Sequence, residues 1–242
     1  MKKVLTPPLN VLYILLVVIF MFSYITIDFN TNCDSSILKF SLVITVSIYV
    51  LIAGLKYIIK KENIKINILY LLAVLFTLIS DYFLLILDDY HAIGVTTFII
   101  AHFMYSLIIY YLNDKRDPIK FFIEKLVLLI IAIIGLVTTK QVFVALASFY
   151  ALNLIMNTIH SLILLIKTKK LNAVFLFIGY VFFVGCDICV LISNIDQIVD
   201  ATQKIVDMEN LCLCIIWIFY GPSQYFLGLS INRGDYNEEK CA

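Results

Sequence analysis

The sequence predicts an all-α, polytopic membrane protein that consists of one bundle of eight transmembrane helices. Three observations support this prediction: 62% of the 242 residues are hydrophobic, only 14% are charged, and the mean hydropathy is +1.01. Water-soluble domains usually contain about 45–50% apolar and about 25% charged residues. So few charges cannot cover a soluble surface, which excludes a soluble enzyme, a disordered chain and a secreted disulfide scaffold.

Eight apolar segments reach the length that crosses a bilayer, which takes roughly 20 residues of helix. In chain order they are Val11–Ile27, Ile37–Leu55, Ile66–Leu87, Ala92–Leu112, Phe121–Val137, Val142–Ile166, Leu171–Ser193 and Leu211–Ile231. The first segment follows Met-Lys-Lys, as a signal peptide would. Two prolines precede it and no small-x-small cleavage site follows it, so we expect it to remain as a helix.

The connections between these segments are short, which favours a compact antiparallel bundle and a single transmembrane domain over residues 1–242. The longest connection, Asn194–Asn210, permits two interpretations, a short interfacial helix or an irregular cap.

The basic residues predict the orientation, because cytoplasmic loops are enriched in Lys and Arg. All but three of the 18 basic residues fall on one predicted side of the membrane, and the exceptions are Lys39, Lys140 and Lys204. Both termini are therefore predicted to be cytoplasmic, with the protein in the plasma membrane if its source is bacterial. The net charge of +1 gives no field that would attract a nucleic acid, so no nucleic-acid partner is expected.

Two aspartates are the only acidic residues predicted to lie well inside the spans. Asp81 and Asp187 each precede the outer end of a predicted helix by six residues, which at about 1.5 Å per residue places both about 9 Å below the same boundary. An ionisable side chain inside a bilayer costs about 2.5–3.5 kcal/mol on insertion scales. We therefore interpret the pair as functional rather than structural.

Further polar residues recur at helical spacing and at similar depths, so that each group shares one face of its helix. They are His102 and Tyr105 in the fourth predicted helix, Asn153 and Asn157 in the sixth, and Tyr220 and Gln224 in the eighth. Such stripes face a bundle interior or a wet cavity, because lipid would leave polar groups unsatisfied. Simpler interpretations stay open: interhelical hydrogen bonding for the asparagines, packing for the histidine, and interfacial placement for tyrosine, of which the chain has 15.

Two carboxyl groups in one low-dielectric pocket cannot easily both ionise, so one is expected to hold a proton at neutral pH. A general acid beside a general base suits hydrolysis through an oxocarbenium-like transition state, as in glycosidases. A proton-coupled transporter of a lipid or small solute is a competing use of the same groups, and a non-catalytic membrane scaffold is a third.

No metal and no other cofactor is predicted. A membrane metal hydrolase needs about three histidines at fixed helical spacings, and this chain has three in all. Cys186-x-x-Cys189 and Cys212-x-Cys214 have the spacing of a zinc site or a redox pair, but buried cysteine more often serves as a small apolar residue.

Several stretches also occur in a distinctive order. They are Leu78-Ile79-Ser80-Asp81-Tyr82-Phe83-Leu84-Leu85, Gly94-x3-Phe98-x2-Ala101-His102-x2-Tyr105, Tyr150-x5-Met156-Asn157, Phe182-x4-Asp187-x3-Leu191 and Trp217-x2-Tyr220-x3-Gln224. In order and spacing they resemble helices three, four, six, seven and eight of the YhhN-like lysoplasmalogenase family of integral membrane proteins, which also has eight helices. The resemblance runs from Ile66 to Ser230, and Cys186 stands where the family more usually has serine.

The resemblance implies metal-free hydrolysis of the vinyl ether bond of lysoplasmalogens, which gives a fatty aldehyde and a glycerophospho-alcohol. On this hypothesis one of Asp81 and Asp187 protonates the alkenyl carbon and the other activates water, while His102 hydrogen-bonds a carboxylate or the water. The residues expected to line the pocket and hold the polar head are Tyr105, Asn153, Asn157, Tyr220 and Gln224. The expected partners are the lysophospholipid substrate and membrane lipid.

Overall fold

The computed structural model describes residues 7–30, 34–87, 90–113, 117–193 and 203–231, and these residues are helical apart from short connections, with no strand among them. The helices are α1 (Pro7–Asn30), α2 (Ser36–Ile59), α3 (Ile64–Asp81) with the π-helix η1 (Tyr82–Leu87), α4 (His91–Leu112), α5 (Pro118–Thr139), α6 (Val142–Thr168), α7 (Leu171–Ile192) and α8 (Gln203–Leu229). Within this described part, eight helices are long and apolar enough to cross a membrane, which confirms the predicted fold class.

Most helices extend beyond the apolar segments that predicted them. The α2 helix continues to Ile59 and the α6 helix to Thr168, each with a lysine in its last turn. Lysine is a good helix former, and its charge interacts favourably with the carboxyl end of a helix. Hydropathy therefore marks the part of each helix that lies in lipid, and the helix itself runs on into the interface.

At two places the structure has a different conformation from the one predicted. The third span was expected to be one α-helix, but it changes to the π-helix η1 directly after Asp81. Residues 203–210 were assigned to the connection Asn194–Asn210, as part of a short interfacial helix or of an irregular cap. They form the first turns of α8 instead, because polar residues can continue a helix beyond its apolar span. The rest of the predicted connection, residues 194–202, lies outside the described residues, so neither interpretation of it is tested.

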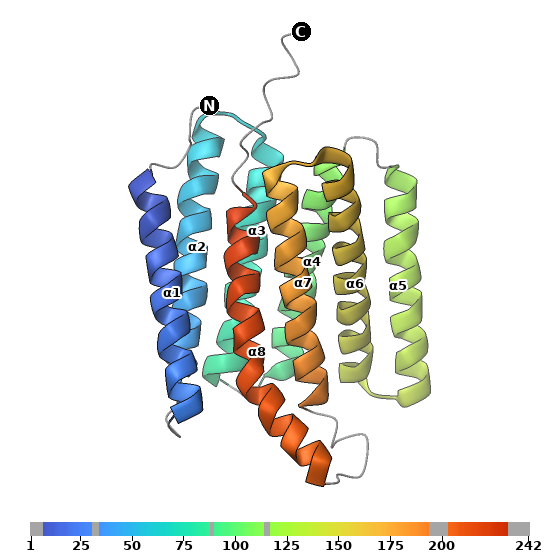
Figure 1. Cartoon of the computed structure of the whole chain (residues 1–242). Coiled ribbons are helices and arrows are strands. Elements are labelled where there is room, and N and C mark those ends of the chain that lie inside the picture. The colour runs from blue at the N-terminus through green and yellow to red at the C-terminus, as the bar shows by residue number, and fades with distance from the viewer. Residues whose placement is uncertain (1–6, 31–33, 88–89, 114–116, 194–202, 232–242) are drawn as a thin grey trace.

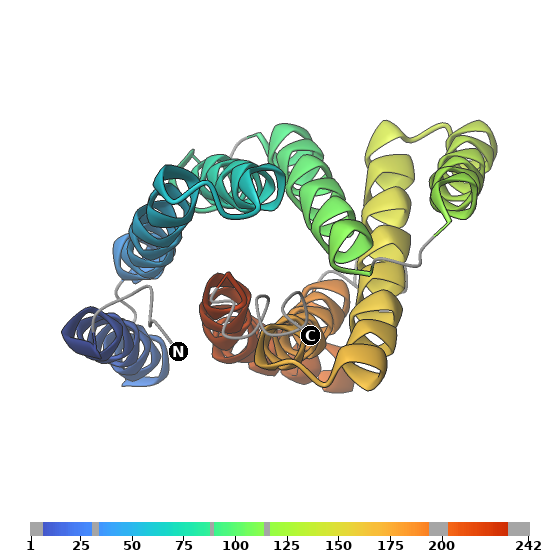
Figure 2. The same ribbon diagram turned by 90° about the horizontal axis from the view of Figure 1, so that it is seen from above.

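Seven of the described helices form a closed ring, and α5 lies outside it (Figures 1 and 2). Around the ring α1 packs on α2, α2 on α3, α3 on α4, α4 on α6, α6 on α7, α7 on α8, and α8 returns to α1 and α2. The α5 helix packs mainly against α6. The interior of the ring is therefore enclosed by helices from both halves of the chain.

The N-terminal end of α1 and the C-terminal end of α8 lie at the same end of the bundle (Figure 1). The opposite end, where α1 finishes and α2 begins, is called the distal end below. That the distal end faces away from the cytoplasm stays a prediction.

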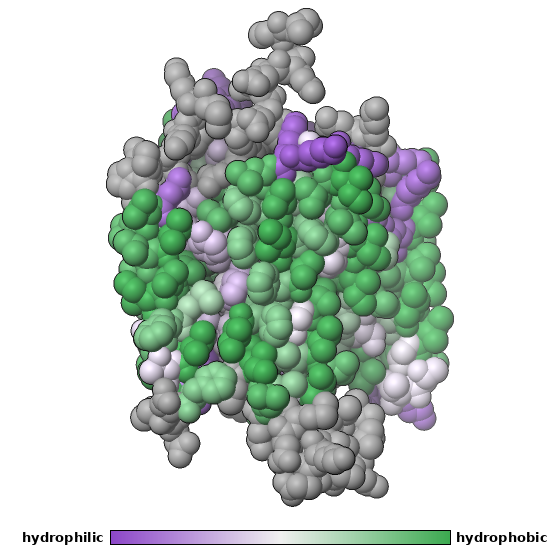
Figure 3. Space-filling model, viewed as in Figure 1, coloured by the Kyte–Doolittle hydropathy of each residue, from purple (hydrophilic) through white to green (hydrophobic). Residues whose placement is uncertain are grey.

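The outer surface of the bundle is apolar, as lipid contact requires. Large side chains such as Ile59, Ile37 and Phe22 are 79%, 74% and 73% exposed. Figure 3 shows a broad hydrophobic band across the visible face, with hydrophilic residues gathered toward its edges. A soluble protein would not leave so much contiguous apolar surface exposed, so the chain is an integral, multi-pass membrane protein.

Candidate active site

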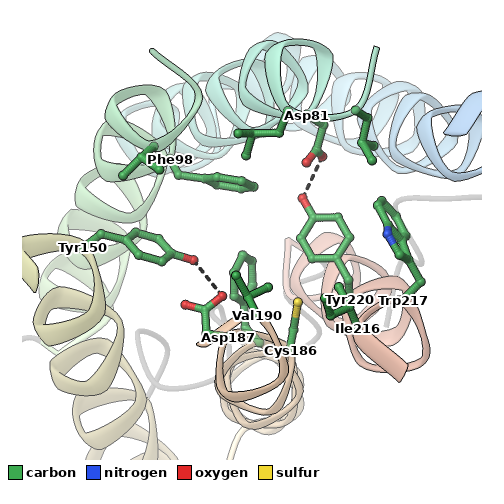
Figure 4. Close-up of a pocket in the computed structure, with 13 residues that line it drawn as sticks. Asp81, Phe98, Tyr150, Cys186, Asp187, Val190, Ile216, Trp217 and Tyr220 are labelled. Atoms are coloured by element: carbon green, nitrogen blue, oxygen red, sulfur yellow. Dashed lines mark hydrogen bonds between the residues drawn. The ribbon is translucent and has the colours of Figure 1, made fainter. Parts of the chain in front are cut away.

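A cavity of about 220 Å³ opens inside the ring, where α3, η1, α4, α6, α7 and α8 face one another (Figure 4). Its lining residues are Asp81, Leu84, Leu85, Val95, Phe98, Tyr150, Phe183, Cys186, Asp187, Val190, Ile216, Trp217 and Tyr220. The two aspartates are the only charged side chains in this lining. The cavity is therefore an apolar, aromatic chamber with a carboxyl group from each of two helices.

Asp81 is the last residue of α3 and is 3% exposed. Its Oδ2 accepts a hydrogen bond of 2.6 Å from the hydroxyl of Tyr220 on α8. The chain continues from Asp81 into the π-helix η1, a rare conformation that is often found at functional sites. Asp81 thus lies where the α-helix changes to a π-helix, and its carboxyl group is held by the Tyr220 hydroxyl from α8, across the ring of helices.

The junction at Asp81 is held against α4 by its neighbours. The hydroxyl of Ser80 donates to the carbonyl of Gly94 at 2.6 Å. A Cβ at Gly94 would lie only 2.5 Å from Cγ of Leu84, which is in η1 and lines the cavity. Glycine at this position therefore allows η1 to approach α4 closely enough to close that wall of the cavity.

Asp187 lies on α7, and its Oδ1 accepts a hydrogen bond of 3.2 Å from the hydroxyl of Tyr150 on α6. Its Oδ2 is buried and has no hydrogen-bond partner among the described residues. A buried carboxyl oxygen without a partner is unusual and calls for an explanation such as a water or a ligand. Its position in the cavity lining gives it access to a bound molecule.

Both carboxyl groups point into the cavity, from opposite walls, in Figure 4. The rings of Phe98 and Tyr220 lie beside the space between them. A molecule in the cavity would therefore have one carboxyl group on each side, together with aromatic rings that attract a developing positive charge. This arrangement can deliver a proton from one side and remove one from the other.

The structure brings three of the eight predicted site residues to this cavity, namely Asp81, Asp187 and Tyr220. Tyr105 and Gln224 are buried but do not line it. Tyr105 lies about two turns beyond Phe98, and Gln224 about one turn beyond Tyr220, in both cases farther from the distal end. They were grouped with the site because helical spacing identifies a face of a helix, and that face extends beyond the length of the cavity.

His102 lies behind the cavity wall. Its ring centroid is 4.7 Å from that of Phe183, 5.4 Å from that of Tyr150 and 6.1 Å from that of Phe98, three residues that line the cavity. Nδ1 of His102 is buried and has no partner among the described residues. Of the two partners predicted for His102, the carboxylate is not bonded to it, because the aromatic wall stands between them, and the bond to water stays a prediction.

Asn157 and Asn153 connect helices instead of lining the cavity. The side chain of Asn157 accepts from Ser106 at 2.6 Å and donates to the carbonyl of His102 at 2.9 Å and to the hydroxyl of Tyr180 at 3.2 Å. These bonds link α4, α6 and α7 at full burial. The simpler interpretation, interhelical hydrogen bonding, describes what the asparagines do in this structure.

A second polar cluster joins α5 to α6. Lys125 donates to Oδ1 of Asn153 at 2.6 Å and lies 3.2 Å from Glu124, whose other oxygen is 3.2 Å from His160. The sequence placed Lys125 with the cytoplasmic charges, but its side chain is only 10% exposed and reaches into the membrane-spanning region. The two aspartates are thus not the only charges inside the bundle.

The cysteines add no metal site in the part of the chain that is described. Cys186 lines the cavity with its sulfur visible in Figure 4, and Cys189 and Cys212 are buried, all three as free thiols. The side chain of Cys214 lies outside the described residues. Among the residues that are described, no group of three or more His, Cys, Asp or Glu side chains is arranged to hold a metal ion.

Several lining residues were not singled out from the sequence as site residues. Tyr150 shares a helical face with Asn153 and precedes it by three residues, so the polar stripe on α6 was the signal that pointed to it. Trp217 was visible as the only tryptophan of the chain. Phe98 belongs to the motif quoted for the fourth predicted helix, and Phe183 precedes Asp187 by four residues and so shares its helical face.

The fold and the cavity together define a multi-pass membrane protein with paired carboxyl groups in an apolar chamber within the bilayer. The YhhN family matches residues 35–231, which is most of the chain, so the protein belongs to the YhhN family. This family contains lysoplasmalogenases and is associated with hydrolase activity. The resemblance found in the sequence is thereby confirmed, and it extends over α2 as well. No curated protein and no solved structure matches the chain.

Proposed function

We propose that this protein hydrolyses the vinyl ether bond of lysoplasmalogens, with Asp81 and Asp187 as the acid–base pair. The observation that carries the proposal is the placement of two carboxyl groups, from α3 and α7, on opposite walls of one apolar cavity. Membership of the YhhN family supports the same reaction class. Keeping two acids inside a bilayer is costly, and acid–base catalysis accounts for that cost.

The first step is the transfer of a proton from one aspartic acid to the substrate. One aspartic acid donates its proton to the double-bond carbon that is not bonded to oxygen, and the carbon bonded to oxygen becomes part of an oxocarbenium ion. The other aspartate then removes a proton from water as the water oxygen bonds to that carbon, which gives a hemiacetal. The aromatic rings that line the cavity stabilise the cation through their negatively polarised faces.

Collapse of the hemiacetal returns both aspartates to their starting states. The aspartate that accepted the proton of water now donates it to the glycerol oxygen as the carbon–oxygen bond breaks. The first aspartate takes the proton of the hemiacetal hydroxyl, and the fatty aldehyde forms. Water is the only co-reactant, and the pair of carboxyl groups is ready for another turnover.

The tyrosines position the two carboxyl groups. Tyr220 and Tyr150 each donate a hydrogen bond to one oxygen of their aspartate, which leaves the second oxygen for substrate or water. Groups held in a productive geometry before the reaction contribute strongly to rate. Apolar side chains such as Leu85, Val190 and Ile216 complete the lining and suit the alkenyl tail of a single-chain lipid.

The test is aldehyde release from lysoplasmalogen by purified Asp81→Asn and Asp187→Asn variants in detergent. Both variants keep the shape of the side chain but cannot exchange a proton, so we expect each to lose at least about 100-fold in activity. Asp117→Asn is the matched control, because Asp117 caps α5 at an exposed position and asparagine caps a helix equally well.

Wild-type rates in both aspartate variants, with the fold intact, would refute the acid–base assignment. Transport of the intact lipid into vesicles without cleavage would instead support the proton-coupled transporter. Mass spectrometry of the lipid after incubation distinguishes the two activities.

A further inference from the structure

An ion pair lies beside the cavity. Nζ of Lys39 on α2 is 2.9 Å from Oδ2 of Asp28 on α1, and the same Nζ lies 5.4 Å from the centroid of the Trp217 ring. Trp217 also lines the cavity, next to Tyr220 (Figure 4). The indole ring therefore connects the ion pair to the chamber that holds the two aspartates.

The ion pair lies nearer the distal end of the bundle than the catalytic carboxyl groups. Lys39 is three residues from the start of α2 and Asp28 two from the end of α1, whereas Asp187 is five residues from the end of α7. At about 1.5 Å per residue of α-helix, the ion pair is roughly 4 Å closer than Asp187 to the distal end of the bundle. A lysophospholipid in this chamber would have its phosphate on the same side, one glycerol unit above the ether bond.

The chemistry of the pair is complementary to a zwitterion. A lysine ammonium is a compact charge that binds phosphate well, and its flexible stem allows it to turn toward a ligand. Asp28 is held in place by a hydrogen bond from the hydroxyl of Ser35 to its other oxygen. When Lys39 turns to a phosphate, Asp28 stays fixed and can accept the ammonium of the same headgroup.

The ion pair between Lys39 and Asp28 is largely buried, which strengthens its electrostatic interactions. The side chains of Lys39 and Asp28 are each 14% exposed, so the pair is largely screened from water. The attraction between opposite charges is stronger in such low-dielectric surroundings than at an open surface. The face of Trp217 adds attraction for a headgroup cation.

We propose that Asp28, Lys39 and Trp217 form a headgroup subsite for a zwitterionic glycerophospholipid, with the phosphate on Lys39 and the ammonium on Asp28. The inference takes its substrate class from the proposed function. It assigns the recognition of the polar head to residues at the distal end, whereas the sequence had placed that role deeper in the bundle.

Binding can be measured without catalysis, because Trp217 is the only tryptophan in the chain and reports on the subsite directly. The purified protein is titrated in non-ionic detergent with two saturated ethers that contain no vinyl bond. One is 1-O-alkyl-lysophosphoethanolamine, and the other is the matching 1-O-alkylglycerol, which has the same tail but no headgroup. The change in tryptophan fluorescence gives a dissociation constant for each.

In the wild-type protein we expect the phosphoethanolamine ether to bind about 10- to 100-fold more tightly than the alkylglycerol. Lys39→Gln should remove most of this preference, and Asp28→Asn should reduce it. Both variants should bind the alkylglycerol as the wild type does, which also shows that they are folded. Lys140→Gln makes the same charge change at an exposed position and should keep the full preference.

The double variant Asp28→Asn/Lys39→Gln removes both charges together, so it tests the subsite without leaving an unpaired ion. It should bind the two ethers about equally. An unchanged headgroup preference in Lys39→Gln or in the double variant would overturn the proposal. Headgroup-dependent binding in a wild-type protein that releases no aldehyde would support the subsite while refuting the proposed hydrolysis.

Discussion

Replacing Tyr220 with phenylalanine tests whether the orientation of the Asp81 carboxyl group controls the reaction. The Tyr220 hydroxyl donates to Oδ2 of Asp81 at 2.6 Å, and the two residues are 4% and 3% exposed. Hydrogen bonds to charged groups contribute about 1.5–3 kcal/mol, which corresponds to about 10- to 150-fold in rate. We therefore expect kcat of Tyr220→Phe to fall by a factor in this range. The ring remains to fill the site, so the fold is retained.

Tyr150→Phe provides the comparison, because its hydroxyl donates to Asp187 across a longer distance of 3.2 Å. The expected loss is smaller, about 2- to 10-fold, as for an ordinary hydrogen bond of about 0.5–1.5 kcal/mol. Tyr70→Phe is the control, since the Tyr70 hydroxyl bonds the carbonyl of Ser230 away from the cavity. It should lower stability and leave kcat unchanged.

The assay is aldehyde release from lysoplasmalogen in detergent, with thermal unfolding of each variant measured in parallel. A wild-type kcat in Tyr220→Phe would refute the positioning role. An equal loss of kcat in Tyr70→Phe would show instead that any lost buried hydroxyl slows the enzyme.

Two further predictions concern packing. Gly94→Ala should lower the free energy of unfolding by about 1–3 kcal/mol and slow the reaction, because the new Cβ would displace Leu84 from the cavity wall. Gly135→Ala is the control: no atom lies within 4 Å of its Cβ, so it should be neutral or stabilising by up to about 1 kcal/mol. The midpoints of thermal unfolding of the two variants are compared. Asn157→Leu should lower the free energy of unfolding by about 1–3 kcal/mol, because its hydrogen bonds to α4 and α7 are lost. Thr96→Val removes only a hydrogen bond within α4 and should be less destabilising. Equal stabilities of Asn157→Leu and Thr96→Val would contradict the interhelical role of Asn157.

The transmembrane organisation could be predicted from the sequence because lipid imposes a simple rule. Each span must be apolar over the thickness of the bilayer, so composition alone located all eight helices. The same rule identified Asp81 and Asp187, because an acid that lipid should exclude needs a reason to be there. The structure places both in the lining of one cavity.

The finer features depend on contacts between distant residues and left no local signal. Tyr220 and Tyr150 bond the aspartates across 139 and 37 residues of sequence. Helical spacing and the motifs marked both tyrosines, but no local pattern showed which aspartate each of them contacts. The π-helix after Asp81 packs closely against Gly94 of α4, and helical periodicity cannot indicate such a contact between two elements. Lys125 looked like a cytoplasmic charge because its partner Asn153 is on another helix.

The measurement that tests the central claim most directly is hydrolysis of lysoplasmalogen in heavy water. The purified wild-type protein is incubated with the lipid in D2O, and the aldehyde is reduced to the alcohol at once to prevent exchange. Protonation at the double-bond carbon that is not bonded to oxygen predicts one deuterium on the carbon next to the aldehyde carbon. An equal amount of glycerophosphoethanolamine should form, and Asp81→Asn should give neither product. Recovery of intact lipid from the wild-type protein, or an aldehyde without deuterium at that carbon, would contradict the account.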